Sequence, residues 1–152
     1  MRDLDGRATA PAPRPVSFLS PMTDQVVIGF DFGARRIGVA IGNSVTREAR
    51  PLTTVNAATV AARWDAVAAL VAEWEPARLV VGIPRHPDGT PHEMTARCER
   101  FARQLEGRYR RPVAQVDERY TSAVSARADD VDAAAAALIL QQWFDEEGGR
   151  DA

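Results

Sequence analysis

Short apolar segments alternate along the chain with longer segments in which apolar residues recur every three or four positions. The short segments are rich in β-branched residues and predict strands, and the longer ones predict amphipathic helices. The predicted strands span about residues 26–31, 37–41, 51–55, 79–83 and 112–117. The predicted helices span about residues 56–75, 94–105 and 131–144.

This order of elements predicts an α/β fold. The first three strands are joined by short connections and form an antiparallel meander, whereas each later strand follows a helix. Because such crossovers place helices against a sheet, we expect a mixed five-stranded sheet with helices on both faces. Asn56 is the expected N-cap of the first helix, and Pro76 is expected to end it.

A single domain accounts for most of the chain, because 152 residues suit one hydrophobic core. We place this domain at residues 25–147 and expect a short C-terminal tail at residues 148–152. Residues 1–24 are rich in proline and have no hydrophobic period, so they predict a disordered extension. Met22 is an alternative first residue.

Composition and charge exclude several classes of protein. No apolar run approaches the ~20 residues of a membrane-spanning helix, so no membrane partner is expected. The single cysteine, Cys98, excludes a disulfide framework and fits a reducing compartment, and its position predicts a core thiol. The net charge of −2, with every basic residue an arginine, argues against nucleic-acid binding by bulk charge alone.

Three acidic residues lie where the predicted fold can bring them together. Asp31 ends the first strand, Glu118 follows the last strand, and Asp132 begins the final helix. Ligands gather beyond the carboxyl ends of parallel strands, so these carboxylates would meet there if the first and last strands are neighbours. Converging carboxylates repel one another unless cations neutralise them, and oxygen ligands favour Mg²⁺ or Mn²⁺. The alternative is a turn-forming aspartate and ordinary helix caps.

Arginines supply the candidate contacts to phosphate, because a guanidinium binds phosphate oxygens through a planar fork. Arg35 and Arg36 follow the first acidic residue on a turn, and residues 97–111 carry six arginines against two glutamates, a local charge of +4. Both regions are candidate surfaces for nucleic acid, with a solvated turn and a solvated helix face as the alternatives. His86 and His92 have no third ligand at metal spacing and are expected at the surface.

Five motifs, in order, resemble those of the YqgF/RuvX family of RNase H-like nucleases. They are IGFDFG with RRIGVA at residues 28–40, RPLTTV at 50–55, VGIP with DGT at 81–90, VDERYTS at 116–122, and VDAAAA with LILQ at 131–141. The resemblance implies an RNase H-like fold and a nuclease site that holds two divalent ions, Mg²⁺ or Mn²⁺. By position, Asp31, Glu118 and Asp132 would be the catalytic metal ligands. The implied substrate-binding residues are Arg35, Arg36, Arg119, Thr121 and Ser122.

The resemblance also implies a cellular role. It points to a cytoplasmic enzyme that processes the 5′ end of precursor 16S rRNA, with structured RNA and the ribosome or a pre-ribosomal particle as partners, acting as a monomer or homodimer. Some family members are described as Holliday junction resolvases, so branched DNA is an alternative substrate. A non-catalytic module that binds nucleic acid or the ribosome is a third hypothesis. An actin-like phosphotransferase would need two domains of this type.

One segment departs from the family pattern. In the family, the motif that matches residues 116–122 is followed by a further helix and a basic segment, whereas only residues 123–131 separate it from Asp132 here. If that segment grips the substrate, its shortening would weaken activity or specificity. Asp129 lies three residues before Asp132, so on a helix it would share that face as an additional ligand or serve as an ordinary cap.

Overall fold

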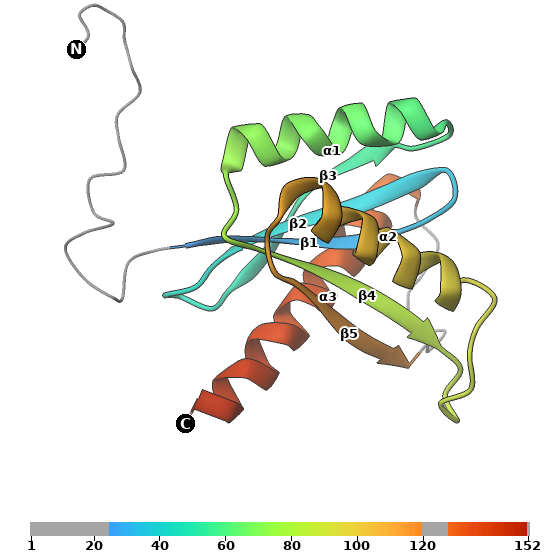
Figure 1. Cartoon of the computed structure of the whole chain (residues 1–152). Helices are drawn as coiled ribbons and strands as arrows, with labels where there is room; N and C mark the ends of the chain where they lie inside the picture. Colours follow the sequence, from blue (N-terminus) through green and yellow to red (C-terminus); the bar gives the residue numbers. More distant parts are fainter. Residues whose placement is uncertain (1–24, 120–127, 152) are drawn as a thin grey trace, which may run out of the picture.

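The computed structural model describes residues 25–119 and 128–151, which form a five-stranded sheet with helices on both faces (Figure 1). The strands are β1 (Val26–Phe32), β2 (Arg36–Asn43), β3 (Ala49–Asn56), β4 (Arg78–Arg85) and β5 (Val113–Arg119). The helices are α1 (Val60–Trp74), α2 (Thr95–Tyr109) and α3 (Ala128–Asp151). The element order is the one predicted from the sequence.

The sheet is mixed, as predicted, with the strand order β3-β2-β1-β4-β5. β1, β2 and β3 pair antiparallel as a meander, whereas β1 pairs with β4 and β4 with β5 in parallel. The carboxyl ends of β1, β4 and β5 therefore lie at the same edge of the sheet. β1 and β5 are not direct neighbours, because β4 lies between them.

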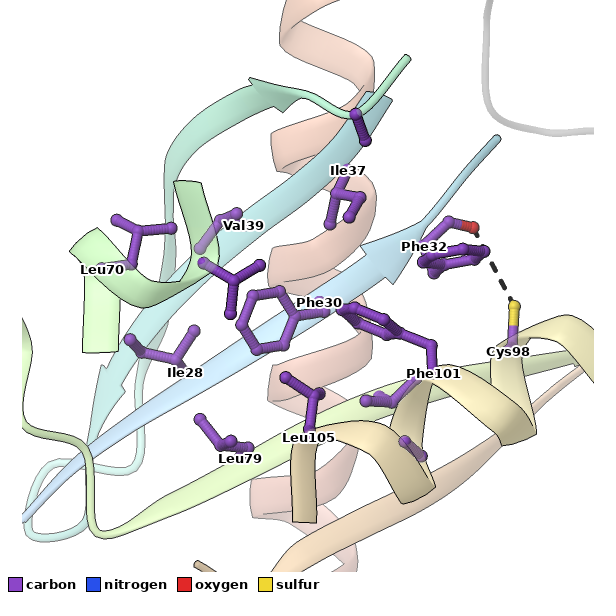
Figure 2. Packing of buried hydrophobic residues seen from close by; sticks show 14 of the residues in the cluster. Ile28, Phe30, Phe32, Ile37, Val39, Leu70, Leu79, Cys98, Phe101 and Leu105 are labelled. Carbon is purple, nitrogen blue, oxygen red and sulfur yellow. Dashed lines mark hydrogen bonds between the residues drawn. The ribbon is translucent and has the colours of Figure 1, made fainter. Parts of the chain in front are cut away.

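Helices α1 and α2 cover one face of the sheet, and α3 covers the other (Figure 1). The larger core lies beneath α1 and α2. There Phe30 of β1 meets Phe101 of α2 edge to face, with ring centroids 5.6 Å apart (Figure 2). The second core packs Ile139, Leu140 and Phe144 of α3 against the opposite face. Two apolar faces on one sheet explain why β1 and β4 read as nearly continuous apolar runs.

Alternation along β1 decides which face each side chain reaches. Ile28, Phe30 and Phe32 belong to the core beneath α1 and α2, whereas Val27 belongs to the core beneath α3. Successive side chains of a strand point to opposite faces, so Asp31 falls on the side of α3. Asp31 and Phe32, although consecutive, therefore point to opposite faces of the sheet.

Cys98 is a core thiol, as predicted. It is buried on α2, and its Sγ lies 3.9 Å from the carbonyl oxygen of Phe32 (Figure 2). Burial, together with the charges of Asp31 and Glu118, raises the pKa of the thiol to about 12. A thiol with this pKa stays protonated at neutral pH, so Cys98 is not a nucleophile.

The N-cap of α1 differs from the expected one. The N-cap of α1 is Thr59, whose side chain accepts a hydrogen bond from the Ala62 amide at 3.0 Å. Asn56, the expected cap, ends β3 and accepts instead from the Ala58 amide in a turn. An asparagine side chain can accept from a nearby backbone amide at the end of a strand as readily as at the start of a helix. The residue type alone therefore does not distinguish these two positions. Glu75 is the C-cap of α1, directly before Pro76, so this helix ends where predicted.

Helix α3 begins before residue 131 and runs through Asp151, including residues for which a tail was expected. Asp132 therefore lies inside the helix and not at its N-cap, which removes capping as the reason for this residue. The expected extension, residues 1–24, lies outside the described residues. None of the helices described is both long and apolar enough to cross a membrane.

A candidate carboxylate site at the sheet edge

Asp31, Glu118 and Asp132 line one cavity of about 330 Å³ at the carboxyl edge of the sheet. Asp31 comes from β1, Glu118 from β5 and Asp132 from α3. The walls of this acid cavity include Phe32, Gly33, Pro84, His92, Met94 and Ala135. The fold thus brings together the three acidic residues that the sequence singled out, although they come from three separate elements and β4 lies between the two strands.

Glycine at position 38 allows α3 to approach the sheet beside this cavity. Gly38 of β2 is the register partner of Asp31, and a Cβ built on it would overlap the carbonyl oxygen of Asp132. A Cβ on Gly82 of β4 would come within 2.5 Å of Ile139 on the same helix and within 3.2 Å of the Glu118 carboxylate. The absence of side chains at these two positions lets α3 lie close enough to bring Asp132 to Asp31.

Burial disfavours the charged form of Asp31 and of Glu118 in this cavity. Burial is the largest cause that raises the pKa of Asp31 to about 7, and the charges of Glu118 and Asp132 raise it further. Burial also raises the pKa of Glu118. Ionisation of Asp31 and Glu118 in this cavity is therefore costly unless a cation compensates their charge.

Asp132 already has one cationic partner. Arg36, the first residue of β2, donates from Nε to Oδ2 of Asp132 at 2.7 Å. The arginine side chain is about half exposed and the aspartate about a quarter exposed. The ion pair therefore lies at the rim of the acid cavity, with the arginine on the solvent side.

The donor set of the cavity fits a hard divalent cation, because it consists of carboxylate oxygens. Within residues 25–119 and 128–151, however, no three acidic, histidine or cysteine side chains form a group close enough to hold one ion together. The three carboxylates share the cavity without converging on a point, and the Asp132 carboxylate is hydrogen-bonded to Arg36.

Asp117, the neighbour of Glu118, does not line the acid cavity. Its Oδ1 accepts from Nε of Arg85 at 2.7 Å, and the same arginine reaches Glu99 of α2 at 3.5 Å. Because consecutive strand residues point to opposite faces, Glu118 turns toward α3 and Asp117 away from it. Of these two adjacent carboxylates, Glu118 alone belongs to the candidate site.

Arg35 and Arg36 line a second, larger hollow of about 830 Å³, which we call the β3 groove. Its walls come from β3, including Thr53, Thr54 and Asn56, and from the start of α3 at Ala133 and Ala134. Arg36 belongs to this groove and also pairs with Asp132, so the groove and the acid cavity adjoin. The sequence identified RPLTTV at residues 50–55 as a family-like motif but predicted no site residue in it, because its only charged side chain is Arg50.

His92, which was expected at the surface, is partly buried and lines the acid cavity. Its Nδ1 accepts from the Met94 amide at 3.0 Å, and its ring lies 5.2 Å from that of His86. The hydrogen bond orients the ring at the start of α2. The signal that the sequence offered was its place just before a helix that follows β4, because that connection passes over the carboxyl edge of the sheet.

Several other predicted site residues are only partly described. The backbone of Arg119 pairs with Arg85 at the end of β5, but its side chain lies outside the described residues, as does the side chain of Asp129. Thr121 and Ser122 lie wholly outside them, within the segment that the sequence suggests is shortened. Their expected roles stay predictions.

The basic run at residues 97–111 is not one surface. The guanidinium of Arg108 lies 3.9 Å from the ring centroid of Trp64, and Arg111 donates from Nε to the Pro76 carbonyl at 2.6 Å. Arg108 thus joins α2 to α1, and Arg111, which follows α2, is bonded to the connection that follows α1. Trp64 itself is buried in the larger core.

A model of the family described as "RuvX: Holliday junction resolvase" matches residues 25–146. The chain is 50% identical over 137 residues to a protein of Polynucleobacter necessarius subsp. necessarius (strain STIR1), and the match covers 88% of this chain and 91% of that protein. It is 52% identical over 130 residues to a protein of Paraburkholderia phytofirmans (strain DSM 17436 / LMG 22146 / PsJN), with 80% and 89% covered. Both proteins carry the name "Putative pre-16S rRNA nuclease".

Among solved structures, the fold is similar to that of RuvC from Thermus thermophilus. The structure titled "T. thermophilus RuvC in complex with Holliday junction substrate" aligns with a TM-score of 0.52 at 16% identity, over 82% of this chain and 96% of that chain. A second structure, titled "Thermus thermophilus RuvC structure", aligns with a TM-score of 0.53 at 15% identity. At this level of identity the likeness concerns the fold, which is the RNase H-like fold predicted from the sequence.

Proposed function

Because the chain belongs to the RuvX family, we propose that it is a metal-dependent endonuclease that hydrolyses phosphodiester bonds at the acid cavity, with the 5′ end of precursor 16S rRNA as its substrate. The observation that carries this proposal is the meeting of Asp31, Glu118 and Asp132 in one cavity. Three carboxylates in a partly buried cavity are stable together only when protons or cations compensate them.

Asp31, Glu118 and Asp132 would hold the divalent ions, Mg²⁺ or Mn²⁺. When bound, a pair of such ions activates a water molecule for attack on phosphorus and stabilises the leaving oxygen. The pKa of Asp31, near 7, means that this side chain gives up its proton at little cost when a cation arrives. A buried aspartate beside two other acids therefore suits a site that binds its ions with the substrate.

Arg36 would pass from Asp132 to the substrate as the ions bind. It lines both the β3 groove and the edge of the acid cavity, and its guanidinium fork matches a phosphate as well as a carboxylate. With Arg35 beside it, the groove offers two positive charges and the hydroxyl groups of Thr53 and Thr54. We propose that the nucleic-acid strand next to the scissile bond lies in this groove. Phosphate contacts of this kind fix the register of a nucleic acid on a protein.

Relatives at 50–52% identity favour ribosomal RNA as the substrate, because their names state it. A precursor rRNA substrate would place the protein in the cytoplasm and in contact with pre-ribosomal particles. The expectation of a monomer or homodimer stays a prediction. Branched DNA is the second candidate substrate, favoured by the description of the family model as a Holliday junction resolvase.

A cleavage assay with paired substrates tests the proposal. The full chain is incubated with a labelled precursor-rRNA stem and, separately, with a labelled four-way DNA junction, in Mg²⁺, in Mn²⁺ and in EDTA. We expect metal-dependent cleavage of the RNA and loss of cleavage in the Asp31→Asn variant, which keeps the shape of the side chain and removes its charge. Preferential cleavage of the junction would reassign the substrate. Full activity of the variant, or binding without any cleavage, would overturn the nuclease assignment in favour of a binding module.

A further inference from the structure

A third hollow, distinct from the acid cavity and the β3 groove, lies between α1 and α2. This arginine groove has a volume of about 290 Å³, and its walls include Phe32, Arg63, Trp64, Arg97, Arg100 and Gln104. Arg63 stands on the first turns of α1, and Arg97 and Arg100 stand one turn apart on α2. Three arginines from two helices thus face one small hollow that also contains an amide side chain.

Within the described part of the chain, these three arginines make no ion pair to a carboxylate. Among residues 25–119 and 128–151, ion pairs to carboxylates are made by other arginines, such as Arg36 and Arg85. Arg63 Nε is buried and has no hydrogen-bond partner in the same part of the chain. Arg97 reaches the sulfur of Met94 at 3.7 Å, which is a weak acceptor. The guanidinium groups are therefore available to a ligand.

The mutual position of these arginines is unfavourable without an anion. Burial lowers the pKa of Arg63, and the charges of Arg97 and then Arg100 lower it further. The guanidinium of Arg63 lies 4.9 Å from the ring centroid of Phe32, which holds it in place at the bottom of the groove. A cluster of positive charge, held by packing against an aromatic ring, matches the forked geometry with which arginine binds phosphate.

The arginine groove and the acid cavity meet at one edge of the sheet. Phe32 lines both, and it is the residue that follows Asp31 on β1 (Figure 2 shows it beside α2). Met94, which Arg97 contacts, also lines the acid cavity. The groove is lined by α1 and α2, and the cavity is lined also by α3, so a nucleic-acid strand bound in both would run along this edge of the sheet.

We propose that Arg63, Arg97 and Arg100 bind the backbone phosphates of a nucleic-acid segment that lies beyond the scissile bond, next to the acid cavity. The inference rests on the proposed function for the identity of the ligand. Phe32 is buried, so it offers no face for a base to stack on. The groove therefore reads the phosphodiester backbone, which RNA and DNA share, and adds affinity without sequence preference.

Binding without metal tests this inference separately from catalysis. Fluorescence anisotropy in EDTA measures the affinity of the full chain for a labelled RNA stem and for a labelled four-way DNA junction, across a series of salt concentrations. The variants are Arg100→Gln and the double variant Arg97→Gln with Arg100→Gln. The matched control is Arg103→Gln, which removes the same charge from the same helix at an exposed position outside the groove.

We expect about tenfold weaker binding for each arginine removed from the groove, since a charged hydrogen bond contributes roughly that factor. The slope of log K against log salt should fall by about 0.9 for each duplex phosphate that the variant no longer neutralises. Arg103→Gln should keep the wild-type affinity and slope. Arg63→Lys keeps the charge but not the fork, and it should weaken binding while the protein still folds. Thermal melting of the double variant should be unchanged or higher, because repulsion is relieved.

Wild-type affinity and salt slope in the double variant would overturn the inference, even if the wild-type protein cleaves RNA. A double variant no weaker than Arg103→Gln would overturn it as well, since the effect would then be one of net charge. The proposed function fails on a different result, namely full cleavage by Asp31→Asn. Each proposal can therefore fail while the other stands.

Discussion

Arg36 of β2 and Asp132 of α3 are 96 positions apart in the sequence, and their side chains meet at 2.7 Å over the edge of the acid cavity. The pair is partly exposed, so it adds little to the stability of the fold. The pair matters for function, because Asp132 is a proposed metal ligand and its carboxylate already has the Arg36 guanidinium as a partner. Arg36 therefore competes with any ion for the Asp132 carboxylate.

Removal of this competition should strengthen metal binding. We expect Arg36→Gln to bind Mn²⁺ about fivefold more tightly than the wild type in the absence of substrate, corresponding to about 1 kcal/mol for a partly exposed pair. The same variant should bind the RNA stem more weakly, because the β3 groove then offers one guanidinium fewer to the phosphates. Calorimetric titration with Mn²⁺ measures the first effect. Arg35→Gln is the control, since Arg35 lines the same groove without an ion pair to Asp132. Weaker Mn²⁺ binding by Arg36→Gln would contradict the prediction.

The raised pKa of Asp31 makes the stability of the metal-free protein depend on pH. The pKa is about 7 in the folded protein and 3.8 as the ordinary value, so between these values the folded state holds a proton that the unfolded chain has released. Stability is therefore lost as the pH rises from about 4 to about 7, by at most about 4 kcal/mol from this group. Asp31→Asn should unfold at higher urea than the wild type at pH 8 in EDTA. At pH 4 the two should differ much less.

Addition of Mg²⁺ at pH 8 should stabilise the wild-type protein and leave Asp31→Asn nearly unchanged. A wild-type protein that gains stability from pH 4 to pH 7 relative to the variant would show that Asp31 is ionised without penalty. That result would remove the argument that the cavity needs a cation.

The fold follows from the sequence because each of its elements is encoded locally. The β-branched runs around Ile28 and Val80 and the helical period from Val60 to Trp74 each depend on neighbouring residues, and the order of elements restricts the topology to few arrangements. The strand-end positions of Asp31 and Glu118 also follow, because parallel strands share a carboxyl edge. The expectation that the first and last strands must be neighbours for these carboxylates to meet was wrong, because β4 lies between β1 and β5 and the two residues still line one cavity.

The contacts between distant elements could not be predicted in this way. Nothing in the motif around Arg36 indicates Asp132 as its partner, and nothing in the run at residues 97–111 separates Arg97 and Arg100 from Arg108, which stacks on Trp64. Side-chain partners on packed helices depend on the rotation and offset of whole elements. The period of apolar residues in the sequence predicts which face of α2 is buried. It does not predict which residue of α1 lies against a given residue of α2.

The cap of α1 offers a local test of one correction. Thr59→Ala should lower the free energy of unfolding by about 1 kcal/mol, because the Ala62 amide loses its acceptor. Thr59→Ser keeps the hydroxyl and should be close to the wild type. Urea denaturation followed by circular dichroism measures both. Equal stability of Thr59→Ala and the wild type would mean that the hydroxyl does not cap the helix.

Gly38 determines how closely α3 approaches the site, so its substitution should damage the site before it damages the fold. In Gly38→Ala the new Cβ would overlap the Asp132 carbonyl oxygen, and the helix must shift away from β2 to make room. We expect a loss of stability of about 1–3 kcal/mol, typical of overpacking, together with weaker Mn²⁺ binding and a larger loss of cleavage. Gly107→Ala is the matched control: this glycine lies in α2 with nothing within 4 Å of an added Cβ, and its replacement should stabilise the protein by about 0.5–1 kcal/mol without affecting cleavage. If Gly38→Ala cleaved RNA at the wild-type rate, the distance between Asp132 and Asp31 would not matter, and Asp132 would have to be removed from the proposed metal ligands.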